Sequence, residues 1–356
     1  MWLTVSFWWN AFEQRQDALQ LQALSSIEDN LFDLADALGQ ERSHIVKLLS
    51  IDINDDVAQE RYAISVSESD RLLRETLQTM SLNTMPLLPS SHGSQIKGYL
   101  DSNRKSLEQI NEDLLSLRAE FIDQSLHDLS PFTANNAIAH FEQYSYLINA
   151  VGMVRRDIQF TPSNTSVKAQ HHAQFIDSIW VLKESNLQAT VLLENMLFNF
   201  ENSHSVIDIQ SHRLLLQKLN YRTALAVEEI RTLGRRYQFS ESIELTMKWE
   251  AEQYLDEYLV LSESLVERLS DGSVTTQELR HWIRSLDELH AFAHHLRTES
   301  TKFTLAEISD VQRKATTNLI IDTFLLVLCV AMAVFSLRYF RRMHYLANHD
   351  LSLIHI

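Results

Sequence analysis

Apolar residues recur every three or four positions through most of the chain, which is the spacing of one face of an α-helix. In the first long run the steps alternate between three and four and skip only Glu41. The apolar positions of this run are Leu24, Ile27, Leu31, Leu34, Leu38, Ile45 and Leu48. Similar runs lie at 100–121 and 175–200. Because each stripe must be buried against neighbouring helices, we expect an all-α fold with a bundle core.

Turn-forming and polar residues divide this pattern into separate helices. The predicted breaks lie at 52–56, 85–93, 130–131, 160–164, 234–240 and 270–273. Thr275 and Glu278 have the spacing of a capping box, which predicts that the last helix begins near Thr276. These helices are too many for one four-helix bundle of ordinary length. We therefore expect a long antiparallel helical bundle, built as two stacked four-helix bundles.

The most apolar stretch of the chain runs from Leu319 to Leu337, with Asp322 as its single charge. As a helix it would be roughly 28 Å long, enough to cross the hydrocarbon core of a bilayer. Its alternative is a buried core helix, but such helices rarely run this long without polar residues. Three arginines follow it as a basic collar: Arg338, Arg341 and Arg342. We predict a transmembrane helix at 319–340 followed by a cytoplasmic segment at 341–356.

Neither glycine nor proline lies between Thr276 and Tyr345. We therefore expect one unbroken helix from the end of the bundle through the membrane. Residues 1–9 are uncharged and rich in tryptophan but too few to span a bilayer. We interpret them as the end of a first membrane helix whose beginning is missing, with an interfacial anchor as the alternative. Residues 10–318 then form an all-helical extracytoplasmic sensor domain.

This plan of a membrane helix, a long all-α module and a second membrane helix resembles the helical bimodular sensor domains of bacterial chemoreceptors, sensor kinases and cyclases. The resemblance is architectural and covers most of the chain. It implies a receptor in the bacterial inner membrane, with a periplasmic sensor domain, a cytoplasmic C-terminus and a small molecule or a protein as its signal.

The residues after the basic collar add a second resemblance. Leu346, Ala347, His349 and Asp350 stand in the order Leu-Ala-x-His-Asp. This order resembles the segment that leads into GGDEF diguanylate cyclase domains. The family resemblance implies condensation of two GTP molecules into cyclic di-GMP, with Mg²⁺, by two such domains facing each other in a homodimer. The family's catalytic residues are not in this chain, so we assign no catalytic residue and no cofactor to it.

Other interpretations of the tail remain open. His349 could be the phosphoacceptor of a histidine kinase, although it follows the membrane segment without the usual linker. The chain could instead be a chemoreceptor-like module, or a membrane-tethered helical interaction module without enzymatic output. The last six residues, Leu351–Ile356, are also what the end of a transposase adapter used in sequencing libraries encodes. We therefore expect the natural sequence to diverge after Asp350.

Composition narrows the classes of partner. With 31 Lys and Arg against 47 Asp and Glu, the chain has a net charge of −16 and no concentrated basic patch, which argues against nucleic-acid binding. Its single cysteine, Cys329, excludes an intrachain disulfide and a cysteine-based zinc site. His290, His294 and His295 have helical spacing, but no further ligand is identified, so we predict no metal site.

One residue suggests a ligand site in the predicted bundle. Arg155 interrupts an apolar stripe that runs from Ala137 to Ile158. A buried arginine needs a counter-charge, which a bound small anion could supply. The alternative is that Arg155 pairs with a glutamate of another helix or reaches the surface. We predict Arg155 as the ligand-binding residue.

Overall fold

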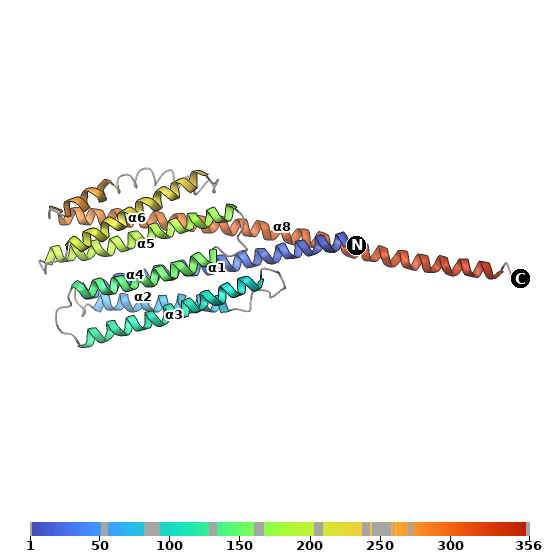
Figure 1. The fold of residues 1–356 in the computed structure, drawn as a ribbon, viewed down its shortest axis with the longest axis horizontal. Coiled ribbons are helices and arrows are strands. Elements are labelled where there is room, and N and C mark those ends of the chain that lie inside the picture. The colour runs from blue at the N-terminus through green and yellow to red at the C-terminus, as the bar shows by residue number, and fades with distance from the viewer. Residues whose placement is uncertain are drawn as a thin grey trace. The chain divides into compact units, whose positions relative to one another are not determined.

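The computed structural model describes residues 2–50, 56–81, 93–127, 134–159, 167–202, 209–236, 243, 258, 260–269 and 273–353. Within these ranges the chain is helical except at 273–275, and no strand occurs among them. The predicted all-α class is therefore confirmed. The helices are α1 (Trp2–Ser50), α2 (Asp56–Ser81), α3 (Gly93–His127), α4 (Ala134–Gln159), α5 (Val167–Asn202), α6 (Ile209–Arg236) and α8 (Thr276–Leu353), and residues 260–269 are also helical (Figure 1).

The chain forms two compact units. One unit is Leu24–Thr304, and the other combines Met1–Ala23 with Leu305–Ile356. The first lies within the range 10–318 predicted for the sensor domain, whose boundaries stay a prediction. We describe each unit by itself.

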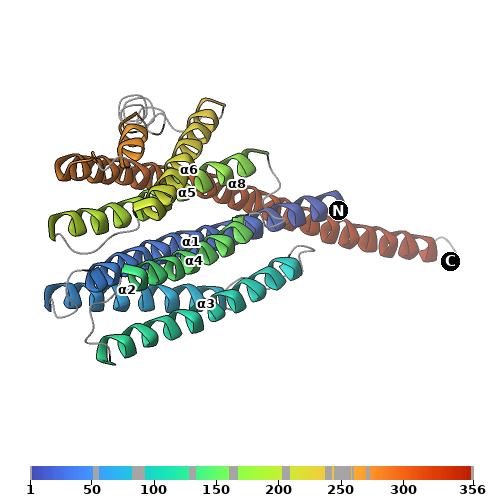
Figure 2. The ribbon, with the colours of Figure 1, turned by 60° about the vertical axis from the view of Figure 1, so that its left-hand side comes forward.

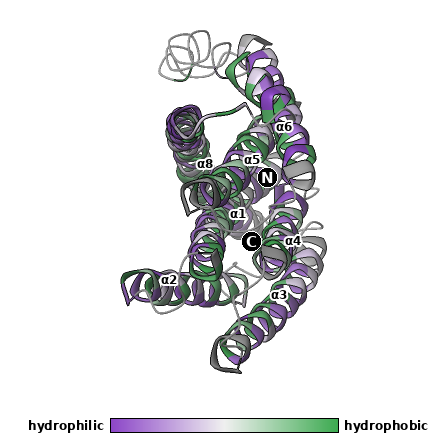
Figure 3. Ribbon diagram, turned by 90° about the vertical axis from the view of Figure 1, so that its left-hand side faces the viewer, coloured by the Kyte–Doolittle hydropathy of each residue, from purple (hydrophilic) through white to green (hydrophobic). Residues whose placement is uncertain are grey.

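In the unit Leu24–Thr304, consecutive helices pack against one another: α2 on α3, α3 on α4, α4 on α5, and α5 on α6. The helices α2 to α4 lie on one side of α1, and α5 and α6 lie on the other (Figures 1 and 2). Each helix carries both hydrophilic and hydrophobic residues around its circumference (Figure 3). The division into two stacked four-helix bundles stays a prediction.

The apolar stripe of α1 is the centre of this unit's core. Leu31, Leu34, Leu38 and Ile45 are completely buried, as the heptad spacing predicts. From α8 the core receives a second stripe, which consists of Leu279, Trp282, Leu286, Leu289, Ala293 and Leu296. Side chains from both ends of the sequence therefore share one core.

Several predicted helix boundaries agree with the structure. The helix α1 ends at Ser50, α3 begins at Gly93, and α8 begins at Thr276. At that start, the Thr275 N–H donates to Glu278 Oε2 at 2.8 Å and the Glu278 N–H donates to Thr275 Oγ1 at 3.3 Å, which is the predicted capping box. The sequence did not predict the boundary between α5 and α6. That segment has no glycine or proline to mark it. The predicted break residues between helices lie mostly outside the described residues.

The second unit contains the candidate membrane segment. Among the described residues, one helix, Thr276–Tyr345 within α8, is long and apolar enough to cross a membrane, with a mean hydropathy of 2.5 in its most apolar window. In the same unit Ala315 is buried, and the indole N–H of Trp8 donates to Thr323 Oγ1 at 3.0 Å. The start of α1 therefore lies beside the start of the apolar stretch of α8.

Candidate functional site

Charged side chains, some fully buried and some half-buried, lie along the flanks of the apolar stripe of α1. They meet charges from α3, α4, α5 and α8, and we call this set the buried ion network. Its members are Glu28, Asp29, Asp33, Asp36, Glu41, Arg42, Arg118, Arg155, Asp177, Lys183, Glu184 and Arg297. A charge taken out of water is tolerated only when it is paired and hydrogen-bonded. The network therefore fixes which helices face α1.

Arg155 on α4, the predicted ligand-binding residue, is completely buried. Its Nη2 lies 2.5 Å from Asp177 Oδ1 of α5, and its Nη1 lies 3.4 Å from Glu28 Oε1 of α1. Its guanidinium also lies over the rings of Phe32 and Trp180, at 5.1 and 5.0 Å from the centroids. The counter-charge that a buried arginine needs thus comes from two carboxylates of the protein. The anion-binding role of Arg155 stays a prediction.

Burial is the largest influence on the protonation of this pair. It raises the pKa of Glu28 and lowers the pKa of Arg155, while the attraction between the two charges acts in the opposite direction on both. The Gln159 side-chain amide also donates a hydrogen bond to Glu28. Burial raises the pKa of Asp29 as well, against the nearby charge of Arg297.

A second arginine of the network, Arg297, lies on α8. Arg297 Nη1 is 2.7 Å from Asp33 Oδ1, and its Nη2 donates to the Asp29 carbonyl oxygen at 3.1 Å. Its guanidinium lies 4.6 Å from the centroid of Phe32, the same ring that Arg155 contacts. Phe32 of α1 is therefore in contact with arginines from both α4 and α8. Lys183 of α5 pairs with Asp36 and is the third cation in this part of the network, beside Arg155 and Arg297.

A small cavity of about 20 Å³ adjoins this part of the network. Glu28, Asp29, Phe32, His172 and Arg297 are among the residues that line it. The Nε2 atom of His172 lies 2.8 Å from the Ser300 hydroxyl and 2.9 Å from the Thr304 hydroxyl. A water molecule needs about 10–15 Å³ of such volume. The cavity therefore has room for roughly one water molecule, and an organic ligand would need the helices to separate.

Glu41, which interrupts the apolar stripe of α1, accepts hydrogen bonds from three other helices. Arg118 of α3 donates to both carboxylate oxygens of Glu41, from Nε at 2.6 Å and from Nη2 at 2.8 Å. The Ser69 hydroxyl donates to Glu41 at 2.8 Å, and the Tyr144 hydroxyl donates at 2.6 Å. Glu41 is completely buried, and its carboxylate joins α1 to α2, α3 and α4.

Arg42, the next residue of α1, is also completely buried and faces α4 and α5. Its Nη1 donates to Ser145 Oγ at 2.9 Å and to Glu184 Oε1 at 2.7 Å, and its guanidinium lies 5.2 Å from the Phe141 centroid. Its Nε and Nη2 have no hydrogen-bond partner in the described part of the chain. Sequence reasoning singled out neither Arg42 nor Arg118. The skipped heptad position at Glu41 was the signal that could have pointed to both.

The structure also places the histidines that were weighed as metal ligands and the backbone of the predicted tail motif. His290 is half-buried, whereas His294 and His295 are exposed. Among the residues described, no group of three or more potential metal ligands is found. The backbone of α8 is helical through the tail motif, whose side chains lie outside those that the structure describes: Leu346, Ala347, His349 and Asp350.

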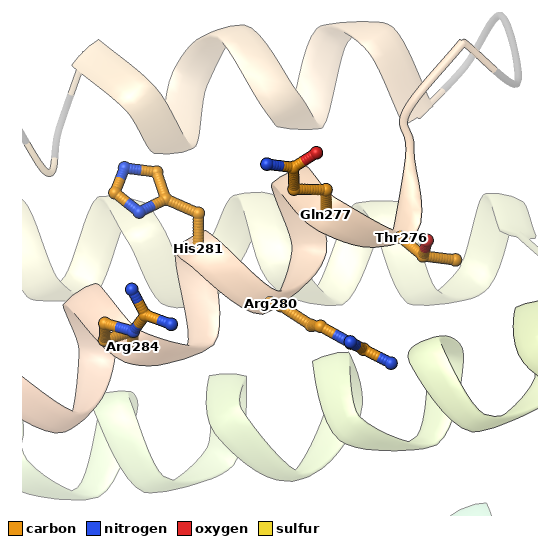
Figure 4. A pocket seen from close by; sticks show the side chains of 5 residues that line it. All are labelled: Thr276, Gln277, Arg280, His281 and Arg284. Atoms are coloured by element: carbon orange, nitrogen blue, oxygen red, sulfur yellow. The ribbon is translucent and has the colours of Figure 1, made fainter.

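A larger, open pocket lies at the start of α8. Its lining includes three basic side chains, Arg280, His281 and Arg284, together with Thr276 and Gln277. Gln277 and His281 project from one side of the helix, and Arg280 points another way (Figure 4). All five residues are exposed, so the pocket is a basic surface of the helix rather than an enclosed site.

Comparison with known proteins adds no assignment: no protein-family model, no curated protein and no solved structure matches this chain.

Proposed function

We propose that this chain is the sensor and transmembrane portion of a bacterial signal-transduction receptor that controls cyclic di-GMP synthesis by a GGDEF domain following Asp350. The continuity of α8 carries this proposal. The same helix provides Trp282 to the bundle core, Arg297 to the buried ion network and the apolar stretch that is long enough to cross a bilayer. A helix is stiff, so a displacement of its bundle end is passed to its far end.

The side chains of the apolar stretch support a membrane environment. Eleven large apolar side chains between positions 320 and 337 are exposed: Ile320, Ile321, Phe324, Leu325, Val327, Leu328, Val330, Met332, Val334, Phe335 and Leu337. Exposed apolar surface of this extent needs a hydrophobic partner. Lipid supplies it in our proposal, with the sensor unit in the periplasm and the basic collar at Arg338 in the cytoplasm of an inner membrane.

The contact of Trp8 with Thr323 supports the placement of residues 1–9 at the membrane. An indole N–H that lies in a bilayer needs an acceptor, and the Thr323 hydroxyl provides one. We propose that the tryptophan-rich segment is part of a first membrane helix that pairs with α8.

Signalling would use the buried ion network as its adjustable element. A ligand or partner protein that favours one arrangement of α1, α4, α5 and α8 would shift α8. Allosteric couplings of about 1–3 kcal/mol are typical and correspond to changes of about five- to 150-fold in output. In a homodimer such a shift would change how two cyclase domains face each other.

The proposal can be tested by fusing the chain at Asp350 to a diguanylate cyclase catalytic domain and measuring cellular cyclic di-GMP. A three-residue Gly-Gly-Pro insertion after Ala306 should uncouple output from the sensor unit, because it breaks α8. A seven-residue helical insertion at the same point should preserve coupling, because it nearly restores the helical phase. Equal output from both variants would contradict the proposal.

Membrane topology is a separate test. Reporter fusions after Asp350 should indicate a cytoplasmic C-terminus, and protease added to spheroplasts should cleave the sensor unit. If the chain stays in the soluble fraction, the receptor proposal fails. Phosphorylation of His349 by a following kinase core would favour the histidine kinase alternative instead.

A further inference from the structure

An exposed apolar row follows the outer face of α6. Leu214 and Tyr221 are 65% and 66% exposed, and they lie seven residues apart, which places them two helical turns apart on one face. Leu225, one turn further on, is 53% exposed. This helix lies at the outer side of the unit Leu24–Thr304 (Figure 3). Its row of large side chains therefore points away from the core.

The row borders a groove between α6 and the helix at 260–269. The groove has a volume of about 710 Å³, and its lining includes Leu214, Tyr221 and Val266. Val260, on the second helix, is 69% exposed and extends the apolar surface. The groove is therefore large enough to receive side chains of another helix.

The two edges of the groove carry opposite charges. Arg213 and Lys218 line it from α6, and Glu263 and Glu267 line it from the helix at 260–269. The whole of α6 has six Lys and Arg against two Glu, in a chain whose net charge is −16. A surface with one positive and one negative edge is complementary to itself after a two-fold rotation about an axis parallel to the groove.

We propose that this α6 groove is the interface through which a second copy of the chain binds, forming a two-fold symmetric homodimer. The apolar row of each copy would pack into the groove of the other. Lys218 of each copy would meet the acidic edge of its partner. This inference rests on the proposed function, because a receptor for cyclase domains needs a dimer.

The charge pattern also explains why other exposed apolar residues fit a second copy less well. Leu115 and Ile122 on α3 are half exposed, but Glu112, Asp113, Glu120 and Asp123 surround them in the sequence. Two such faces would bring like charges together, which disfavours association. At the α6 groove the two edges have opposite charges, so this repulsion between two copies is avoided.

The test is a charge exchange in the full chain, purified in detergent, with the dimer dissociation constant measured by sedimentation. Lys218→Glu and Glu263→Lys should each raise that constant at least tenfold, because each places two like charges across the interface. The double variant should restore it to within about threefold of the unaltered chain, since the charges are then exchanged but again complementary. A monomeric unaltered chain, or single variants that dimerise normally, would overturn the inference.

Cross-linking distinguishes this interface from association through the membrane segments. In a Cys329→Ser background, Gln217→Cys in the groove should give interchain products with a short bismaleimide, and Leu115→Cys on α3 should not. The reverse result would overturn the proposed surface. Circular dichroism checks that each variant is folded. If the chain dimerises by another surface, the proposed α6 interface is wrong. The proposed function would still hold if the chain inserts into the membrane and α8 couples the sensor unit to the output.

Discussion

Arg118 of α3 binds both carboxylate oxygens of Glu41 in α1, at 2.6 and 2.8 Å, with both side chains almost completely buried. The two residues are 77 positions apart in the sequence. Their pairing explains why an otherwise regular apolar stripe contains a glutamate. It also predicts how the unit Leu24–Thr304 responds when one charge is removed.

Replacing Arg118 by methionine should destabilise this unit by about 3–5 kcal/mol, because the Glu41 carboxylate stays buried without its cation. The double variant Glu41→Leu/Arg118→Met should recover much of that loss, since the one carboxylate still deprived of Arg118, Asp70, is 36% exposed and can be hydrated. Urea denaturation followed by circular dichroism measures both changes. Arg104→Met, which removes an exposed ion pair with Glu108 on the same helix, is the control and should cost no more than about 1 kcal/mol. Equal losses for Arg118 and Arg104 would contradict this account.

Arg155 should be equally costly to remove. Arg155→Ala leaves Glu28 beside a cavity without its cation and leaves Asp177 paired with Arg156 alone, and we expect a loss of about 3–5 kcal/mol. If Arg155 also binds an anion, the variant should lose the thermal shift that small carboxylates or phosphate give to the unaltered chain. Asp177→Asn keeps the cation and one carboxylate partner, so it should retain the fold and the anion response. An anion shift that persists in Arg155→Ala would discard the site.

His290 should make the protein sensitive to acid. Burial, followed by the nearby charge of Lys183, lowers the pKa of His290 to about 4, while Asp36 acts in the opposite direction and His294 adds to the lowering. A histidine with a lowered folded-state pKa stabilises the fold above its ordinary pKa of 6.5, and that contribution is lost as the pH falls toward 4.

The role of His290 is tested by measuring the free energy of unfolding of His290→Gln and of the unaltered chain between pH 7 and pH 4. The loss of stability over that range should be smaller in the variant than in the unaltered chain, with a difference on the order of 2 kcal/mol, because the variant has no buried imidazole to protonate. His281→Gln changes an exposed histidine of the same helix and should follow the unaltered chain. Parallel pH profiles for all three proteins would show that His290 is not responsible.

The pairing of α1 with α8 beside the apolar stretch can be detected by cross-linking within one chain. With Cys329 replaced by serine, Trp8→Cys/Thr323→Cys should react with a short bismaleimide in membranes, because the two side chains are hydrogen-bonded in the structure. Trp9→Cys/Thr323→Cys is the matched control, since Trp9 is half exposed and points about 100° away on the helix. Products of equal yield from both pairs would argue against this contact.

Much of the fold could be predicted from local patterns. The spacing of Leu31, Leu34 and Leu38 predicted a buried helical stripe, and Thr275 with Glu278 predicted the start of α8. Both features depend on residues within two turns of one another. The boundary between Asn202 and Ile209 was not predicted, because polar residues without glycine or proline can continue a helix as well as end it.

The candidate site was predictable only in part. An arginine on an apolar stripe marked Arg155 as a residue that needs a counter-charge. The identity of that counter-charge depends on Glu28 and Asp177, which are 127 and 22 positions away. Arg42 and Arg118 gave no signal of their own, since arginine on a helix is ordinarily exposed, and only the glutamate at the skipped heptad position indicated that buried cations lie nearby.

By itself, the sequence determined the helical class, the apolar stretch of α8 and the absence of any helix-breaking residue within it, because these follow from backbone geometry and the spacing of side chains along one helix. The tertiary structure alone decided which charges of α1 meet which partners, and that Phe32 contacts arginines from two other helices. Periodicity states which face of a helix is buried, but the choice of its neighbour depends on how all the helices pack together.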